Sequence, residues 1–191
     1  MRWSCALRRV AALALLVGVD SHLVQSSPSV DLRRDGALSI AGRALRCGAA
    51  RNVLDPGLPN LGLAAPGVVV FNPFLLNRQP DTVRLFVFHH ECGHHHVGAS
   101  ETGADCWAVK QGVRQGWLDR QGLMQVCRSF GNGPATPTHP SGARRCASLE
   151  QCFASAATAK QRNEEPAKTS PAPKLITGPK LVRDRAQRSV Q

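Results

Sequence analysis

The segment His90-Glu91-Cys92-Gly93-His94 constrains this chain more than any other, because five residues define a helix, two ligands and a carboxylate. Residues four apart lie on one face of a helix, so His90 and His94 can present two imidazoles to one metal ion. Glu91 follows His90 on the helix, so its carboxylate is turned away from direct ligation but lies within reach of a water bound to that ion. Two nitrogen ligands, an open coordination position and an adjacent carboxylate base are the parts of a zinc hydrolase. The alternative is a histidine-rich buried helix that binds no metal.

The flanking sequence predicts that this segment belongs to a buried helix over about residues 82–96. Apolar residues 85–88 run directly into the first histidines, and Asp81 is a plausible N-cap. Residues 97–100 follow as a turn, which Gly98 favours. The two histidines are therefore expected on one helix, with its apolar face in the interior of the fold.

The remaining patterns predict a small α+β domain, mostly helical, with a short sheet beside the metal helix. A strand is expected over residues 67–71, where Asn72-Pro73 ends it, and a weaker one over 36–43. Residues 52–67 are rich in proline and glycine and are expected to form a loop. Asn72 either marks a cleft or simply ends the strand. Further helices are expected over 100–114, 118–130 and 141–155, with a loop over 131–140.

A third ligand is expected from the segment after the turn. Residues 101–108 predict a second helix capped by Ser100, and Glu101 and Asp105 share one of its faces because they lie four apart. A catalytic zinc site takes three protein ligands and water, and its imidazoles need acceptors for their other N–H groups. Glu101 as ligand and Asp105 as acceptor supply both. The reverse assignment, with Asp105 as the ligand and Glu101 as the acceptor, stays open. So does the alternative that the acidic residues only stabilise the N-terminus of the helix and bind no metal.

His-Glu-x-x-His followed by Glu-x-x-Ala-Asp resembles the gluzincin metallopeptidases, in particular bacterial neutral zinc metallopeptidases. The segment Thr138-His139-Pro140, followed by Arg144 and Arg145, is similar to a pattern that such enzymes carry at the start of a late helix. The resemblance spans residues 67–152 and implies a zincin-like fold.

The resemblance also implies a role for each matching residue. It gives Zn²⁺ three ligands, which are His90, His94 and Glu101. Glu91 would be the general base, Asp105 the carboxylate behind a ligating imidazole, and His139 at most an auxiliary residue near the site. A metzincin is excluded, because it needs glycine and histidine where this chain has Val97 and Ser100.

The predicted function is hydrolysis of a peptide or protein substrate by a zinc-activated water, with Glu91 as general base. The strand before the metal helix suits this chemistry, because its edge can hold an extended peptide by backbone pairing. Two alternatives are a non-catalytic zinc-binding envelope protein and a zinc-dependent amidase that acts on cell-wall peptides. Glu91 favours an enzyme, since a purely structural site has no use for a base.

Residues 1–26 predict a secretory signal peptide. Three arginines precede the apolar run 10–19, which is shorter than the roughly twenty residues of a membrane-spanning helix. The chain is therefore expected to be secreted or periplasmic, with an uncleaved N-terminal anchor as the alternative. The mature zincin-like domain is expected over residues 27–156.

Residues 157–191 are expected to form a disordered, basic, proline-rich tail. The chain has a formal net charge of +11, and the signal and the tail supply much of it. We interpret this charge as a sign that the basic tail contacts the envelope or a membrane surface. No nucleic acid is expected, because aromatic residues make up only 5% of the chain and no nucleic-acid motif is recognisable.

Six cysteines follow Cys5, and they are Cys47, Cys92, Cys106, Cys127, Cys146 and Cys152. An even number in a small exported domain predicts up to three disulfides, in any of about fifteen pairings. Cys92 lies two residues from each histidine of the motif and so faces away from the metal. A structural disulfide is therefore expected for Cys92.

Overall fold

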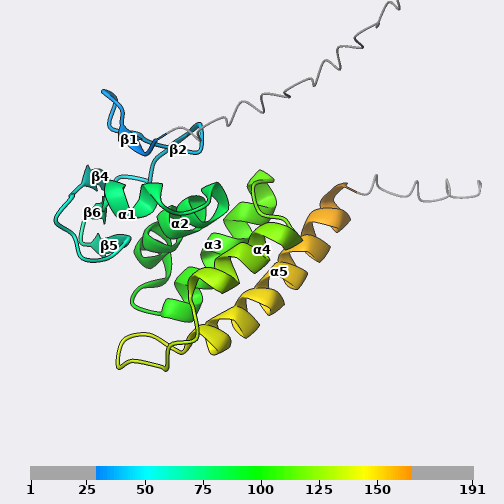
Figure 1. The fold of residues 1–191 in the computed structure, drawn as a ribbon. Coiled ribbons are helices and arrows are strands. Elements are labelled where there is room, and N and C mark those ends of the chain that lie inside the picture. Colours follow the sequence, from blue (N-terminus) through cyan, green and yellow to red (C-terminus); the bar gives the residue numbers. More distant parts are fainter. Residues whose placement is uncertain (1–28, 165–191) are drawn as a thin grey trace, which may run out of the picture.

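The computed structural model describes residues 29–164, and within them it is a mixed structure of helices and two small sheets (Figure 1). The predicted α+β class is confirmed. The first sheet is an antiparallel meander of β1 (Asp31–Leu32), β2 (Leu38–Ile40) and β3 (Arg43–Leu45). The second contains β4 (Arg51–Leu54), β5 (Gly62–Ala65) and β6 (Val68–Phe71), in the order β4-β6-β5.

The expected loop over residues 52–67 is wrong, because β4 and β5 lie within it. Its prolines and its glycines other than Gly62, which belongs to β5, fall in the connections. Pro66 and Gly67 form the turn of the β5–β6 hairpin, and Gly67 has a φ of 72°. β4 pairs with β6 in parallel and β5 pairs with β6 in antiparallel fashion. The pairing of β4 is decided by a partner more than a dozen residues away, which local composition does not reveal.

The weak strand expected over 36–43 is in fact a hairpin. β2 and β3 are joined at Ala41 and Gly42, whose φ values of 50° and 72° match the left-handed backbone of a two-residue turn. The hairpin lets both strands place residues against the same core. Leu38 and Ile40 of β2 and Leu45 of β3 are all buried.

Five helices follow the second sheet within the described residues, and four were expected. Their bounds are α1 (Pro73–Asn77), α2 (Asp81–Val97), α3 (Glu101–Gln115), α4 (Arg120–Ser129) and α5 (Gly142–Glu164). The short α1 was not predicted. The Asn72 side chain accepts hydrogen bonds from the N–H groups of Phe74 and Leu75, so Asn72 is the N-cap of α1.

Two expected helix boundaries need correction. Asp81 is the first residue of α2 rather than its N-cap; Pro80 occupies the cap position and the Asp81 carboxylate contacts Arg84. α5 continues to Glu164, so residues 157–164 are helical and not part of a disordered tail. The remainder of the predicted tail and the predicted signal peptide lie outside the described residues.

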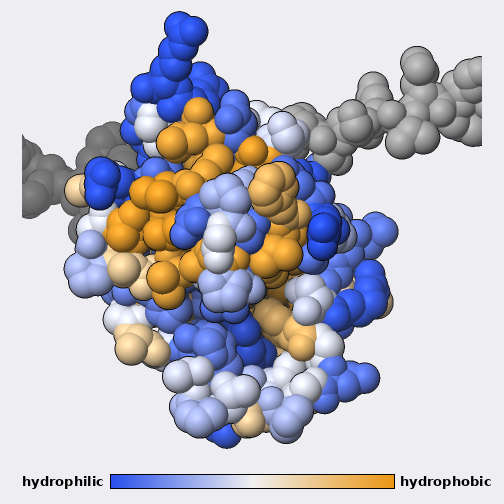
Figure 2. Space-filling model, turned by 60° about the vertical axis from the view of Figure 1, so that its left-hand side comes forward, coloured by the Kyte–Doolittle hydropathy of each residue, from blue (hydrophilic) through white to orange (hydrophobic). Residues whose placement is uncertain are grey.

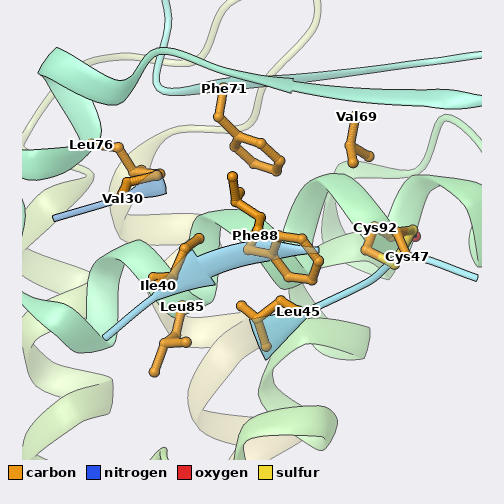
Figure 3. Packing of buried hydrophobic residues seen from close by; sticks show 11 residues of the cluster. Val30, Ile40, Leu45, Cys47, Val69, Phe71, Leu76, Leu85, Phe88 and Cys92 are labelled. Atoms are coloured by element: carbon orange, nitrogen blue, oxygen red, sulfur yellow. A yellow bond between two sulfur atoms is a disulfide. The ribbon is translucent and has the colours of Figure 1, made fainter. Parts of the chain in front are cut away.

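Helix α2, which carries the His-Glu-x-x-His motif, lies between two hydrophobic cores. In Figure 1 the sheets and the helices α3–α5 lie on opposite sides of α2. On the sheet side Phe88 stacks against Phe71 of β6, with ring centroids 5.6 Å apart (Figure 3). On the other side Val83 and Phe86 pack against α3, α4 and α5. The apolar run before the histidines is therefore buried from both sides, which fixes the position of the motif.

Three disulfides cross-link the fold, as the cysteine count predicted. The pairs are Cys47–Cys92, Cys106–Cys152 and Cys127–Cys146. They connect the segment after β3 to α2, α3 to α5, and α4 to α5. Three disulfides in a small domain indicate an oxidising environment, extracellular or periplasmic. Among residues 29–164, no helix has the length and apolar character needed to cross a membrane.

Candidate metal centre

Three ligand atoms from two helices converge on one point. His90 and His94 project from α2, and Glu101 is the first residue of α3. The Nε2 atoms of the two histidines lie 3.2 Å apart. Glu101 Oε2 lies 3.3 Å from His90 Nε2, and Glu101 Oε1 lies 3.7 Å from His94 Nε2. This group could hold a metal ion.

The chain reverses sharply between α2 and α3 to bring Glu101 to the histidines. Gly98 has a φ of 72°, a backbone region that disfavours other residues. Ser100 then caps α3 by accepting a hydrogen bond from the N–H of Gly103, as predicted. The short connection therefore suffices to place a carboxylate from the second helix against the first.

Both imidazoles have their Nδ1 atom engaged, which leaves Nε2 as the atom that faces the centre. His90 Nδ1 lies 2.8 Å from Asp105 Oδ1, and His94 Nδ1 lies 2.8 Å from the carbonyl oxygen of Gly98. An acceptor at Nδ1 keeps the proton on that nitrogen and exposes the lone pair of Nε2. The two histidines are thus held in the tautomer and orientation that a metal requires.

The spacing and the chemistry of this group fit zinc. A tetrahedral ion with bonds of about 2.0–2.1 Å separates neighbouring nitrogen ligands by about 3.3 Å. The separation of the two Nε2 atoms and that of His90 Nε2 from Glu101 are close to this value. Glu101 Oε2 is moreover a buried oxygen whose nearest side-chain nitrogens, His90 Nε2 and His139 Nε2, lie 3.3 and 3.4 Å away. A cation at the centre would satisfy it.

Asp105 is buried completely, and a third helix supplies its counter-charge. Its side chain is 0% exposed. Arg145 of α5 donates to both of its oxygens, with distances of 2.8 Å to Oδ2 and 2.6 Å to Oδ1. The guanidinium also lies over the ring of Phe130, 4.1 Å from the ring centroid. Arg145 therefore holds the carboxylate that holds His90.

The charges of this network alter the pKa values of its members in the metal-free protein. Burial alone would lower the pKa of His90, but the hydrogen bonds to Asp105 and Glu101 outweigh it and raise the pKa to about 9. Burial raises the pKa of Asp105, yet Arg145 and His90 bring it below its ordinary value. Without a metal the centre thus stores a proton on His90 between two carboxylates.

Glu91 lies beside this group and faces β5. A Cβ atom on Gly62 would lie 2.8 Å from Glu91 Cγ, so only glycine leaves room for the carboxylate there. Burial raises the pKa of Glu91, and the neighbouring His90 and the backbone N–H of Ala64 act in the opposite direction. The carboxylate is close to the centre without being one of the three converging ligand atoms.

The loop before α5 brings His139 to the same place, as the sequence predicted. His139 Nε2 lies 3.4 Å from Glu101 Oε2, and the side chain is half exposed. The Thr138 hydroxyl lies 2.9 Å from His139 Nδ1, and the His139 N–H donates to the Thr136 hydroxyl oxygen. These contacts orient the imidazole at the rim of the centre.

Two cavities flank the centre and meet at Glu101. The one beside His90 and Glu91 has a volume of 830 Å³. Its apolar walls include Leu61, Leu63, Leu75 and Phe86. The other has a volume of 750 Å³ and lies beside His94, where small residues form much of its wall: Ala64, Ala65, Gly98 and Ala99. Figure 2 turns the side with the second sheet forward and shows hydrophobic surface gathered on it. The centre thus opens into a cleft on both sides.

Comparisons of the chain with models of protein families, with curated proteins and with solved structures find no match.

The sequence located the residues of the metal group but not two of their supports. Arg145 was visible only as part of a pattern, and its pairing with Asp105 spans 40 positions. β5, which carries Gly62 and Ala64, fell within the expected loop. The apolar alternation from Leu61 to Leu63 was the one local signal for this strand, and it is short.

Proposed function

We propose that this protein is a small zinc metallopeptidase, in which His90, His94 and Glu101 hold the zinc ion. The observation that carries the proposal is the convergence of three ligand atoms whose histidines are both anchored through Nδ1. Asp105 then orients His90 rather than binding the metal, because it lies at the Nδ1 side of the imidazole. A histidine-rich helix without a metal would have no need for this arrangement.

Zinc, when bound, supplies a Lewis acid that polarises a carbonyl group and lowers the pKa of water toward about 7. Glu91 accepts a proton from the attacking water and passes it to the leaving amine. Its burial raises its pKa and so increases its basicity toward neutral pH. His139 acts as an auxiliary group, whose Nε2 can donate to a carbonyl oxygen as negative charge develops there.

The substrate we propose is an extended segment of a peptide or protein. The sequence suggested that the strand at residues 67–71 offers its edge, but β6 is the central strand of its sheet. β5 is the strand beside Glu91, and within the described residues it pairs with β6 alone. An added strand would therefore pair with β5 and run through the two cavities of the cleft.

A non-catalytic zinc-binding protein is the less well supported alternative. A metal that only links two helices needs neither a buried carboxylate beside it nor a cleft on either side.

A secreted or periplasmic location agrees with the three disulfides. Contact of the basic tail with an envelope or membrane surface concerns residues outside the described range and stays a prediction.

The decisive experiment compares the wild type with Glu91→Gln. Elemental mass spectrometry is expected to find one zinc per chain in both proteins, because glutamine preserves the size of the side chain. Hydrolysis of a peptide library, followed by mass spectrometry, is expected to fall by about a hundredfold or more in the variant, since the proton acceptor is lost. A folded wild type that binds no zinc, or equal hydrolysis by both proteins, would contradict the proposal.

A further inference from the structure

A separate cavity lies on the opposite face of α2 from the candidate metal centre. His89, Cys92 and His96 line it from α2, at positions three and four apart that face away from His90 and His94. β3 and the turn after it contribute one wall, and α3 contributes another. The cavity has a volume of 370 Å³, within the range of sites that bind small molecules. We propose that this cavity binds a small aromatic carboxylate.

The floor of the cavity is apolar. Leu45, Phe88 and Cys92 line it, and all three are buried. Cys92 is held in place by its disulfide with Cys47.

One wall is an aromatic shelf. The rings of His96 and Trp107 are stacked, with centroids 4.7 Å apart and planes inclined by 13°. His89 approaches the same indole at 6.1 Å. Both His96 and Trp107 line the cavity. A further planar ring can extend this stack, because stacking stabilises aromatic pairs beyond the effect of their burial.

The rim carries positive charge and amide groups. Arg46 follows β3 and Arg114 lies on α3, and both line the cavity with Gln111 and Gln115. None of the described residues that line it is acidic. Arg46 contacts Asp35, which lies outside the lining, at 3.3 Å. A guanidinium has five N–H donors in a planar fork, so Arg46 and Arg114 can each still bind a carboxylate.

The cations at the rim of the cavity are not offset by an acidic residue among the described residues that line it. An anionic head group at the rim and a flat apolar ring on the shelf match the two halves of the cavity.

Titration of the full zinc-loaded chain with phenylacetate tests the proposal. Quenching of tryptophan fluorescence and calorimetry are expected to report saturable binding of one molecule per chain. Phenylacetamide, which lacks the charge, and cyclohexylacetate, which lacks the aromatic ring, are each expected to bind at least tenfold more weakly. No binding of phenylacetate, or equal binding of all three compounds, would overturn the proposal.

Amino-acid substitutions test whether phenylacetate binds in this cavity. Arg114→Gln is expected to weaken phenylacetate binding at least tenfold, and Trp107→Leu is expected to abolish the fluorescence response. Arg120→Gln, an exposed change at the start of α4 and outside the cavity, is expected to bind as the wild type does. A carboxylate that bound at the metal centre instead would lose affinity in His90→Ala and keep it in Arg114→Gln, and that result would also overturn the proposal.

Discussion

At the scale of single residues, each histidine of the candidate metal group is oriented by a contact at Nδ1, the nitrogen that faces away from the centre. The Asp105 carboxylate contacts Nδ1 of His90, and the Gly98 carbonyl oxygen contacts Nδ1 of His94. The two acceptors differ in kind, because one is a charged side chain and the other belongs to the backbone. Substitution can therefore test the anchor of His90 directly, whereas the anchor of His94 depends on the path of the turn.

Glu101→Gln and Asp105→Asn are expected to weaken zinc binding to different degrees. Loss of a direct ligand should remove most of the affinity, while loss of a partner behind a ligand costs about 10–100-fold. Zinc titration against a chelator of known affinity measures both, and Glu150→Gln on the exposed face of α5 serves as the control. The assignment would be reversed if Asp105→Asn abolished binding and Glu101→Gln did not.

The stability of the metal-free protein is expected to fall as pH rises from 6.5 through 9. The pKa of His90 is raised from 6.5 in the unfolded chain to about 9 in the folded one. The protonated imidazole therefore stabilises the folded state fully below pH 6.5, and this contribution is lost as the pH passes the folded pKa. Urea unfolding at several pH values measures the change.

His90→Gln provides the reference for this pH dependence. The variant lacks the titrating group, so its free energy of unfolding should vary less between pH 6.5 and pH 9. Zinc competes with the same proton, so the zinc affinity of the wild type should rise over this pH range. An equal loss of stability in both proteins would show that another group is responsible.

At the scale of elements, α5 completes a centre whose ligands come from α2 and α3. Its Arg145 pairs with Asp105 across 40 positions, and the neighbouring Cys146 is bonded to Cys127 of α4. The other disulfide of α5 joins it to α3. α5 is therefore fixed to both neighbouring helices close to the point where its arginine reaches the network.

Arg145→Met is expected to lower zinc affinity through Asp105. A buried carboxylate without its cation favours the protonated form and holds His90 less well. If Arg145 acts through Asp105, Asp105→Asn should weaken zinc binding, and addition of Arg145→Met to that variant should weaken zinc binding little further. Zinc titration of the two single variants and the double variant measures the coupling.

Arg144→Met is the matched control for this cycle. Arg144 is exposed and adjacent in sequence, while Arg145 makes the contacts to Asp105. The control should bind zinc as the wild type does. Independent, additive losses in the Arg145 and Asp105 variants would contradict an action of Arg145 through Asp105.

At the scale of the whole molecule, the fold is built around α2. One hydrophobic core joins α2 to the sheets, and the other joins it to α3, α4 and α5. Each disulfide links elements within one of these two layers or to α2 itself. The metal helix is thus held from both sides before any metal binds.

Thiol titration of the denatured, unreduced full chain is expected to find at most one thiol, that of Cys5. Each disulfide constrains the unfolded chain and contributes about 2–4 kcal/mol to stability. Reduction should therefore lower the urea midpoint strongly, and recovery on reoxidation serves as the control. Six or seven free thiols in the unreduced protein would contradict the pairing and the oxidising environment.

The sequence by itself determined what depends on short spacing. The helical periodicity predicted α2 to α4 and the start of α5, and positions four apart placed His90 with His94 and Glu101 with Asp105. Ser100 was recognised as a cap because its bond closes over three residues. Helix geometry is local, since every hydrogen bond spans four residues, so such features can be read from a few neighbours.

Only the tertiary structure decided what depends on distant partners. It selected three disulfides among the available pairings, paired β4 with β6, and placed β5 rather than β6 beside Glu91. It also brought Arg145 to Asp105 and made the cavity behind α2 from three separate segments. These contacts form because the two sides of α2 must be buried at once, and the packing that achieves this is a property of the whole chain.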